Sequence, residues 1–496
     1  MAEKTSLNST SKPLDASAIK KKSVGGAVSF FVRTLILNGL GFVSTLILGG
    51  LLEKTEFAVY GVVTQIIGIL TFFSDIGLAS ALIQKKSEPD ERDYQTIFWT
   101  QMALSFVIVL ICFGLVQSGV FASQLGSEGP GILYALAFGF VLATLKVVPS
   151  IKLTRALDFS RLIWPQILEQ VTYQGLLIIL VLRGVGVAAY TYAIWARGII
   201  GAIAMLILVP FWPRLIFSGK SFLSSVKYGC KFQLNDLLAR VKDQLFYLFV
   251  ASNYAQVHFG VTPEQFGIIS FAKQWSMYPY NLTVQNVMSI PFPTFSRLQG
   301  DKRLIRRAIE KSIYFITLAI FPILTGMCVF FWPLTQVIPA YHKWEDALVS
   351  FVFFTLAIAP AAISSPLTNV LNAIGKINDT LKLMVLWTVL TWIVTVPLLK
   401  VWGFDAVAIA SFLISLTSFL PVFMVKKYVD FNLWDQIWRQ LTASLLMAAF
   451  GLGLMHVWTQ SLIWTLIGGA GSSLVYALSV IVLGRTKLWT EVRSLR

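Results

Sequence analysis

Apolar runs of membrane length recur along the whole chain, and they leave few folds open. The chain has 496 residues, of which 56% are hydrophobic and only 13% are charged. A helix of about 20 apolar residues crosses the hydrocarbon layer of a bilayer, and we find about fourteen such runs. They lie at residues 25–52, 58–83, 97–117, 130–151, 166–183, 187–212, 229–252, 266–292, 308–332, 347–374, 382–400, 405–425, 438–458 and 462–483. Because these runs lack the alternation of barrel strands, we expect an all-α integral membrane protein.

Lysine and arginine gather at every second loop. Loops 117–130 and 253–265 contain neither, whereas Lys85 and Lys86 follow the second run and Lys426 follows the twelfth. This is the pattern of cytoplasmic loops, and it predicts that both termini are cytoplasmic. The formal net charge of +16 therefore indicates membrane topology rather than nucleic-acid binding.

A repeated phrase indicates two similar halves. Tyr60-Gly61, which opens one long run, is echoed by Phe266-Gly267 in the second half, and both runs carry polar side chains. Such repeats place a transport site at their interface. We therefore expect a disordered cytoplasmic tail at 1–24, six helices at 25–213, six more at 226–426, two further helices at 438–484 and a cytoplasmic tail at 485–496.

The sequence lacks the motifs of common catalytic sites. It contains no GxxxxGK[ST], HExxH or GxSxG motif, and Cys112, Cys230 and Cys328 are far apart. We expect no catalytic residues, no metal site and no enzyme activity, which leaves a secondary transporter.

Polar residues line one face of several runs. Thr34, Asn38, Gly41 and Thr45 share a stripe in the first run, beside Arg33. Small-residue helix packing explains the threonines and glycines, but charges at membrane depth need a partner, a wet cavity or a function. Arg33 and Asn38 are therefore candidate cavity residues.

Two acidic residues each have a structural and a functional interpretation. Asp75 lies in the second run, where an interface position near Lys85 competes with a gating role. Glu169 opens the fifth run, and a structural pair with Arg197 competes with a cavity role.

The seventh run is the richest in charge. Its side chains Asp236, Arg240, Asp243 and Tyr247 are spaced for one helix face, and Lys242 lies on a neighbouring face. An ion network within the helix is one interpretation of these charges. Their presence inside a membrane span favours a face that lines a water-filled cavity.

The eighth run adds a stripe of Gln274, Tyr278, Asn281 and Gln285, with Lys273 beside it. Pro279 is expected to bend this helix. A polar cavity with several cations suits an anionic cargo rich in hydroxyl groups.

These motifs resemble a known group. The segment FAVYGVVTQIIGILTFFSDIGLASALIQKK from Phe57, RALDF from Arg155, PTFSRLQGDKRLIRRA from Pro293 and NVLNAIGKIND from Asn369 are similar to motifs of Wzx-type bacterial polysaccharide flippases. These form a branch of the multidrug/oligosaccharidyl-lipid/polysaccharide exporter superfamily. The resemblance covers roughly residues 25–430.

The resemblance implies a function and a partner. It implies a flippase in the bacterial plasma (inner) membrane that moves an undecaprenyl-pyrophosphate-linked oligosaccharide by alternating access between two six-helix lobes. The oligosaccharide would be an O-antigen, capsule or exopolysaccharide repeat unit. It further implies coupling to a proton, to sodium or to the membrane potential, and contact with the polysaccharide polymerase machinery and membrane lipids.

Site residues follow in two groups. The expected cargo-binding residues are Arg33, Asn38, Arg240, Lys242, Lys273, Gln274 and Asn281. The expected coupling or gating residues are Asp75, Glu169, Asp236 and Asp243. The competing functions are a drug or metabolite antiporter of the same superfamily and a membrane glycosyltransferase or polymerase, for which the large outer loop is missing.

Overall fold

Helices form all of the regular structure in the part of the chain that the computed structural model describes. It describes residues 34, 36–74, 78–84, 88–156, 158–219, 222–223, 239–285 and 302–493. Within these ranges, eight helical segments are long and apolar enough to cross a membrane, and a shorter apolar helix spans Ile36–Leu51. The all-α membrane fold is confirmed, while the count of fourteen spans stays a prediction.

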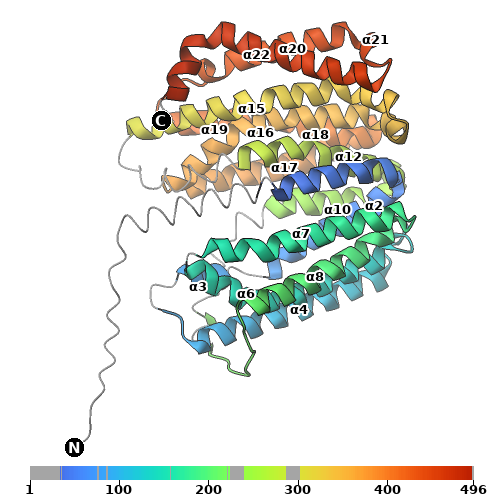
Figure 1. Cartoon of the computed structure of the whole chain (residues 1–496), viewed down its shortest axis with the longest axis vertical. Helices are drawn as coiled ribbons and strands as arrows, with labels where there is room; N and C mark the ends of the chain where they lie inside the picture. The colour runs from blue at the N-terminus through green and yellow to red at the C-terminus, as the bar shows by residue number, and fades with distance from the viewer. Residues whose placement is uncertain are drawn as a thin grey trace, which may run out of the picture.

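The N-terminal half contains the first helix and α2 to α8. The elements after the first helix are α2 (Lys54–Ser74), α3 (Leu78–Gln84), α4 (Glu91–Ser118), α5 (Ala122–Leu125), α6 (Gly129–Arg155), α7 (Phe159–Leu182), η1 (Gly186–Ala188) and α8 (Ala189–Leu208). Helix α4 begins at a capping box of Asp90 and Asp93 and ends at Gly119, whose left-handed backbone (φ 66°) suits glycine. Helices α4, α6, α7 and α8 pack side by side (Figure 1).

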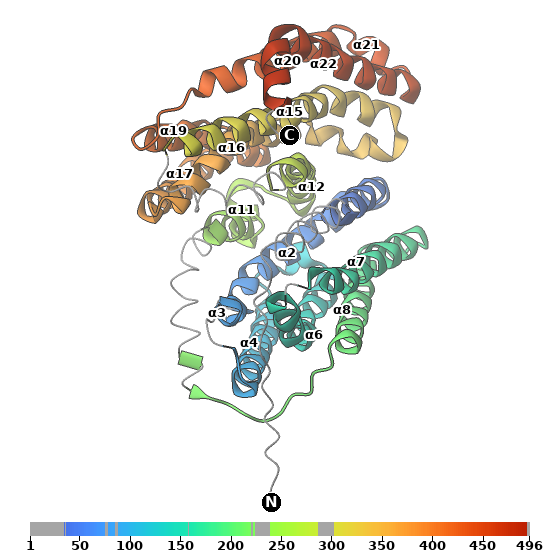
Figure 2. The same cartoon turned by 60° about the vertical axis from the view of Figure 1, so that its left-hand side comes forward.

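The C-terminal half contains η2 and every element after it. These elements are the wide-turned η2 (Val241–Leu245), α10 (Phe246–Val250), α11 (Asn253–Phe259), α12 (Pro263–Tyr280), the wide-turned η3 (Asn281–Gln285), α15 (Lys302–Val337), η4 (Pro339–Ala347), α16 (Leu348–Ala373), α17 (Ile377–Trp402), η5 (Gly403–Asp405), α18 (Ala406–Ser415), η6 (Leu416–Ser418), α19 (Phe419–Lys426), α20 (Leu433–Gly453), α21 (Met455–Trp458) and α22 (Leu462–Arg493). Helices α20 and α22 pack together against α15, on the side away from the N-terminal half (Figures 1 and 2).

Two predicted helices differ in detail from the structure. The run 405–425 is divided into α18 and α19 by the tighter turn of η6. Helix α12 ends near Pro279 and continues as η3, whose wider turns suit a site where proline removes a backbone donor.

The outward surface of the bundle is apolar. Leu110, Ile207 and Val482 are 69%, 75% and 79% exposed, and many other large apolar side chains are exposed on the long helices. Exposed apolar surface of this extent requires a nonaqueous surrounding. The chain is therefore a multi-pass membrane protein.

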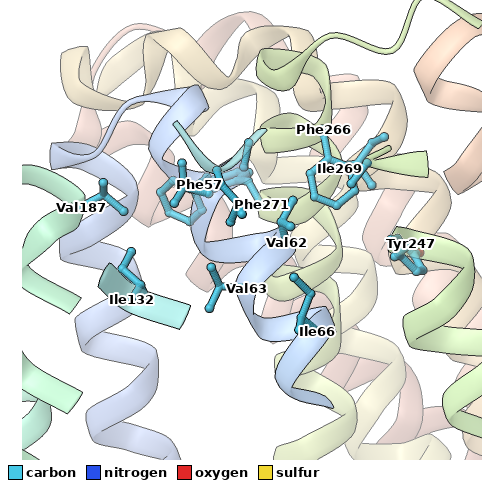
Figure 3. Packing of buried hydrophobic residues seen from close by; sticks show 14 of the residues in the cluster. Phe57, Val62, Val63, Ile66, Ile132, Val187, Tyr247, Phe266, Ile269 and Phe271 are labelled. Carbon is cyan, nitrogen blue, oxygen red and sulfur yellow. The ribbon is translucent and has the colours of Figure 1, made fainter. Parts of the chain in front are cut away.

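Helices α2 and α12 join the halves, and the repeated phrase lies at their contact. A β-carbon at Gly267 would overlap the backbone oxygen of Lys54, and one at Gly61 would overlap Ser270 and approach the Phe266 ring. Only glycine permits so close an approach. Phe57 of α2 and Phe271 of α12 lie next to each other within this contact (Figure 3). The two aromatic-glycine pairs, Tyr60-Gly61 and Phe266-Gly267, therefore meet in space.

Candidate functional site

A polar cavity of about 630 Å³, the N-half cavity, lies among the first helix, α2, α6, α7, α8 and α12. Its polar lining includes Asn38, Thr45, Thr64, Lys146, Glu169, Gln170, Tyr173, Gln174, Arg197, Gln274 and Tyr278. Two predicted cargo-binding residues from different halves, Asn38 and Gln274, therefore line the same space. Tyr278 reaches across as well, with its hydroxyl 2.5 Å from that of Thr45.

Glu169 holds two cations in this cavity. Its carboxylate lies 2.7 Å from Lys146 Nζ and 3.8 Å from Arg197 Nε. The Glu169 side chain packs against Gly201, where any larger residue would overlap it. Helix rise places Lys146 about 25 Å and Glu169 about 15 Å from the starts of α6 and α7, well inside the bilayer thickness. The structure therefore contains both the ion pair between Glu169 and Arg197 and a polar cavity that Glu169 lines.

Lys146 was not recognised from the sequence. It is the only charged residue between Gly129 and Lys152, in the otherwise apolar α6. A single lysine in the middle of an apolar run could have indicated a site, since a charged residue at membrane depth requires a partner or a water-filled cavity.

Tyrosine rings form one wall of the N-half cavity. The rings of Tyr60 and Tyr190 stack with centroids 4.2 Å apart, and Arg197 lies over the Tyr173 ring at 5.5 Å. Aromatic faces of this kind bind cations and the apolar faces of ring-shaped ligands.

A second polar cavity of about 460 Å³, the C-half cavity, lies among η2, α12, α16, α17 and α18. Lys242, Asp243 and Lys273 line it. Lys242 Nζ lies 2.6 Å from the Asp243 carboxylate, and Lys273 Nζ lies 3.2 Å above the centre of the Tyr247 ring. Three predicted site residues therefore meet here, in a different space from Asn38 and Gln274.

Arg240 and Asp243 do not share a face, contrary to the prediction. Arg240 directs its guanidinium to the backbone oxygen of Gly68 in α2, whereas Asp243 faces the C-half cavity. The wider turn of η2 rotates each residue by less than an α-helix does, so side chains three positions apart diverge. Arg240 is instead a contact between the two halves.

The remaining predicted residues fall elsewhere. Asn281 begins η3 and lines none of the three cavities described in this section. Arg33, Asp75 and Asp236 lie outside the described residues. Among the residues that are described, no group of three His, Cys, Asp or Glu side chains is placed to hold a metal ion.

A third space, the apolar groove, has a volume of about 640 Å³. It runs between the first helix, α12, α15, η4, α20 and α22, and it is lined by Phe42, Trp275, Pro322, Met327, Phe330 and Leu466, among others. Tyr278 lines both this groove and the N-half cavity. A polar and an apolar compartment thus lie on the two sides of one side chain.

One end of the bundle is closed by contacts between the halves, and we call it the closed end. The Trp344 indole donates to the backbone oxygen of Gly49 at 2.6 Å, and its ring meets Phe57 of α2 edge to face with centroids 5.0 Å apart. Lys54 Nζ lies 2.6 Å from the Asp346 carboxylate. Residues of η4 therefore fasten the C-terminal half to the end of the first helix and the start of α2.

Comparison with known proteins places the chain in a family. A family model described as polysaccharide biosynthesis protein matches residues 47–349, more than half of the chain. The succinoglycan biosynthesis transport protein ExoT of Rhizobium meliloti (strain 1021) is 22% identical over 293 residues, which are 58% of this chain and 57% of that protein. The lipopolysaccharide biosynthesis protein WzxC of Escherichia coli (strain K12) is 23% identical over 390 residues, 75% of this chain and 74% of that protein.

Solved structures show the same fold. The lipid II flippase MurJ, in an inward closed conformation, superposes with a TM-score of 0.75 at 14% identity, covering 92% of this chain and 99% of that chain. An inward-facing multidrug resistance MATE family transporter superposes with a TM-score of 0.56 at 14% identity, covering 80% of this chain and 95% of that chain. The chain shares the fold of these membrane transporters, and the resemblance found in the sequence is confirmed. The chain belongs to the polysaccharide biosynthesis protein family.

Proposed function

We propose that the protein is a flippase that moves an undecaprenyl-pyrophosphate-linked oligosaccharide across the bacterial plasma membrane. The observation that carries this proposal is the contact between the N-half cavity and the apolar groove at Tyr278. An amphiphilic cargo needs a wet compartment for its head and a lipid-like compartment for its chain. The names of the relatives, which refer to succinoglycan and lipopolysaccharide biosynthesis, support a glycan cargo.

The anionic head group binds in the N-half cavity. Lys146 and Arg197 share the single carboxylate of Glu169, so they carry one positive charge in excess. A pyrophosphate competes with Glu169 for both cations and adds bidentate hydrogen bonds from the guanidinium. Glu169 therefore neutralises the site while no cargo is bound.

The prenyl chain leaves through the apolar groove. Its lining combines aromatic and aliphatic side chains with little polar surface, which matches a hydrocarbon ligand. Because the groove reaches α22 and the exposed flank of the bundle, the chain stays in lipid while the head group crosses.

Movement between two conformations follows from the closed end. We infer from the positions of the basic loops that this end faces the outside of the cell, so that the cavities open toward the cytoplasmic side in this conformation. Separation of η4 from the end of the first helix and the start of α2 opens the outer side. The energy comes from a proton, a sodium ion or the membrane potential.

A gene deletion in the protein's own host tests the proposal. We expect lipid-linked oligosaccharide to accumulate in the cytoplasmic leaflet and surface glycan to disappear, and wild-type protein to restore both. The Arg197→Met variant is expected to fail, and Lys427→Met, at an exposed position, to succeed. Normal surface glycan together with a gain in drug sensitivity would support the antiporter instead.

A further inference from the structure

The C-half cavity is separate from the space assigned to the pyrophosphate. Helix α12 forms the wall between them, with Gln274 and Tyr278 on the N-half side and Lys273 and Tyr280 on the C-half side. The proposed function assigns the head group of the cargo to the N-half cavity and the prenyl chain to the apolar groove. A third lined space of about 460 Å³ is left without a ligand.

The described lining of the C-half cavity carries an excess positive charge. Lys242 and Lys273 face one carboxylate, that of Asp243, which is paired with Lys242 at 2.6 Å. Lys273 lies over the Tyr247 ring and has no acid within ion-pair distance among the described residues. Two ammonium groups would repel a metal cation here, whereas a ligand with one negative charge would neutralise the excess positive charge of the lining.

Hydroxyl groups make up much of the remaining polar lining. Ser365, Thr391 and Ser411 donate to backbone oxygens of their own helices at 2.9, 2.8 and 2.7 Å. Their protons are used there, and Ser365 Oγ also accepts a hydrogen bond of 2.7 Å from the Tyr280 hydroxyl. A hydroxyl oxygen has two lone pairs, so each of these oxygens can still accept a hydrogen bond from a ligand. Several hydroxyl acceptors in one space match a ligand with several hydroxyl donors.

Aromatic rings complete the cavity. Trp387 and Tyr247 line it, and the Trp387 indole is fixed by a bond of 2.9 Å to Thr417. A flat aromatic ring held in place binds the apolar face of a sugar ring, while polar groups around it set the orientation.

We propose that the C-half cavity binds an acidic sugar, a uronate-type residue of the glycan cargo. Its carboxylate pairs with Lys273 and its hydroxyl groups donate to Ser365, Thr391 and Ser411. This inference rests on the proposed function, since it assigns the sugar of the same cargo. The cavity thereby favours glycans that carry a carboxylate.

Calorimetric titration of the purified full-length protein with glucuronate and with glucose tests this inference. We expect glucuronate to bind at least tenfold more tightly than glucose. Lys273→Met should remove that preference, Lys273→Arg should keep it, and the exposed control Lys427→Met should leave it unchanged. Size-exclusion chromatography and the melting temperature without ligand verify that each variant is folded.

Three results would overturn the acidic-sugar site: no binding of glucuronate, equal binding of the two sugars, or loss of the preference in Lys146→Met instead of Lys273→Met. The same protein preparation is assayed for movement of two lipid-linked cargoes, one that carries a uronate and one with neutral sugars only. Flipping of either cargo without glucuronate binding refutes this inference alone, whereas absence of flipping of both cargoes refutes the proposed function.

Discussion

Trp344 is predicted to hold the closed end together. It lies in η4 of the C-terminal half, is fully buried, and contacts the N-terminal half at two points. Its ring meets Phe57 edge to face with centroids 5.0 Å apart, and its N–H donates to Gly49. Both contacts are lost when the halves separate, so Trp344→Ala should favour the conformation that is open at this end.

The expected change in the ratio of the two conformations follows from the free energies of these two contacts. An edge-to-face aromatic pair contributes about 0.5–1.5 kcal/mol, and a neutral hydrogen bond about 0.5–1.5 kcal/mol. Together they amount to about 1–3 kcal/mol, or about a 5- to 150-fold change in the ratio of the two conformations. The Lys54–Asp346 pair contributes less, about 0.2–1 kcal/mol, because the Asp346 side chain is 67% exposed.

Pulsed electron paramagnetic resonance measures the ratio of the two conformations through the distance between two spin labels. Spin labels at Glu128→Cys and Glu264→Cys, both exposed at the closed end but in different halves, report the separation after the native cysteines are replaced. We expect Trp344→Ala to move population from short to long distances, and Trp164→Ala, at an exposed tryptophan, to leave the distribution unchanged. An unchanged distribution in folded Trp344→Ala would refute the reasoning.

Three further predictions concern the cavity, the helix contact and the groove. Lys146→Met should lower the rate of cargo movement at least tenfold in vesicles, because it leaves Glu169 facing Arg197 alone, whereas Lys427→Met should not; equal rates would contradict the head-group site. Gly267→Ala should lengthen the spin-label distance, because its β-carbon overlaps Lys54, whereas Gly139→Ala has free space around it and should not. Gly469→Leu should fill part of the apolar groove and slow the movement of prenyl-linked cargo with little change in melting temperature; full activity would contradict the path of the chain.

The sequence predicted the helical membrane fold, because this follows from the length of its apolar runs. It also pointed to Tyr60-Gly61 and Phe266-Gly267 as related segments. That these segments contact each other was not predicted, because pairing between distant helices depends on packing that a single sequence does not reveal.

Helix periodicity placed individual side chains well only where the helix is regular. Asn38 and Gln274 lie in regular helices and meet in the N-half cavity. Arg240 directly precedes the wide-turned η2 and Asp243 lies within it, so the assumed rotation of about 100° per residue failed. Helix periodicity does not point to Lys146, because Lys146 is a single cation in an apolar helix and belongs to no stripe of polar residues.

Movement of a lipid-linked oligosaccharide in reconstituted vesicles tests the central claim most directly. A labelled undecaprenyl-pyrophosphate oligosaccharide is placed in one leaflet, and a membrane-impermeant glycosidase reports its arrival in the other. We predict that vesicles with the wild-type protein move the glycan at least tenfold faster than vesicles without protein. Equal rates with and without the protein, under a proton gradient, a sodium gradient and a membrane potential in turn, would contradict the account.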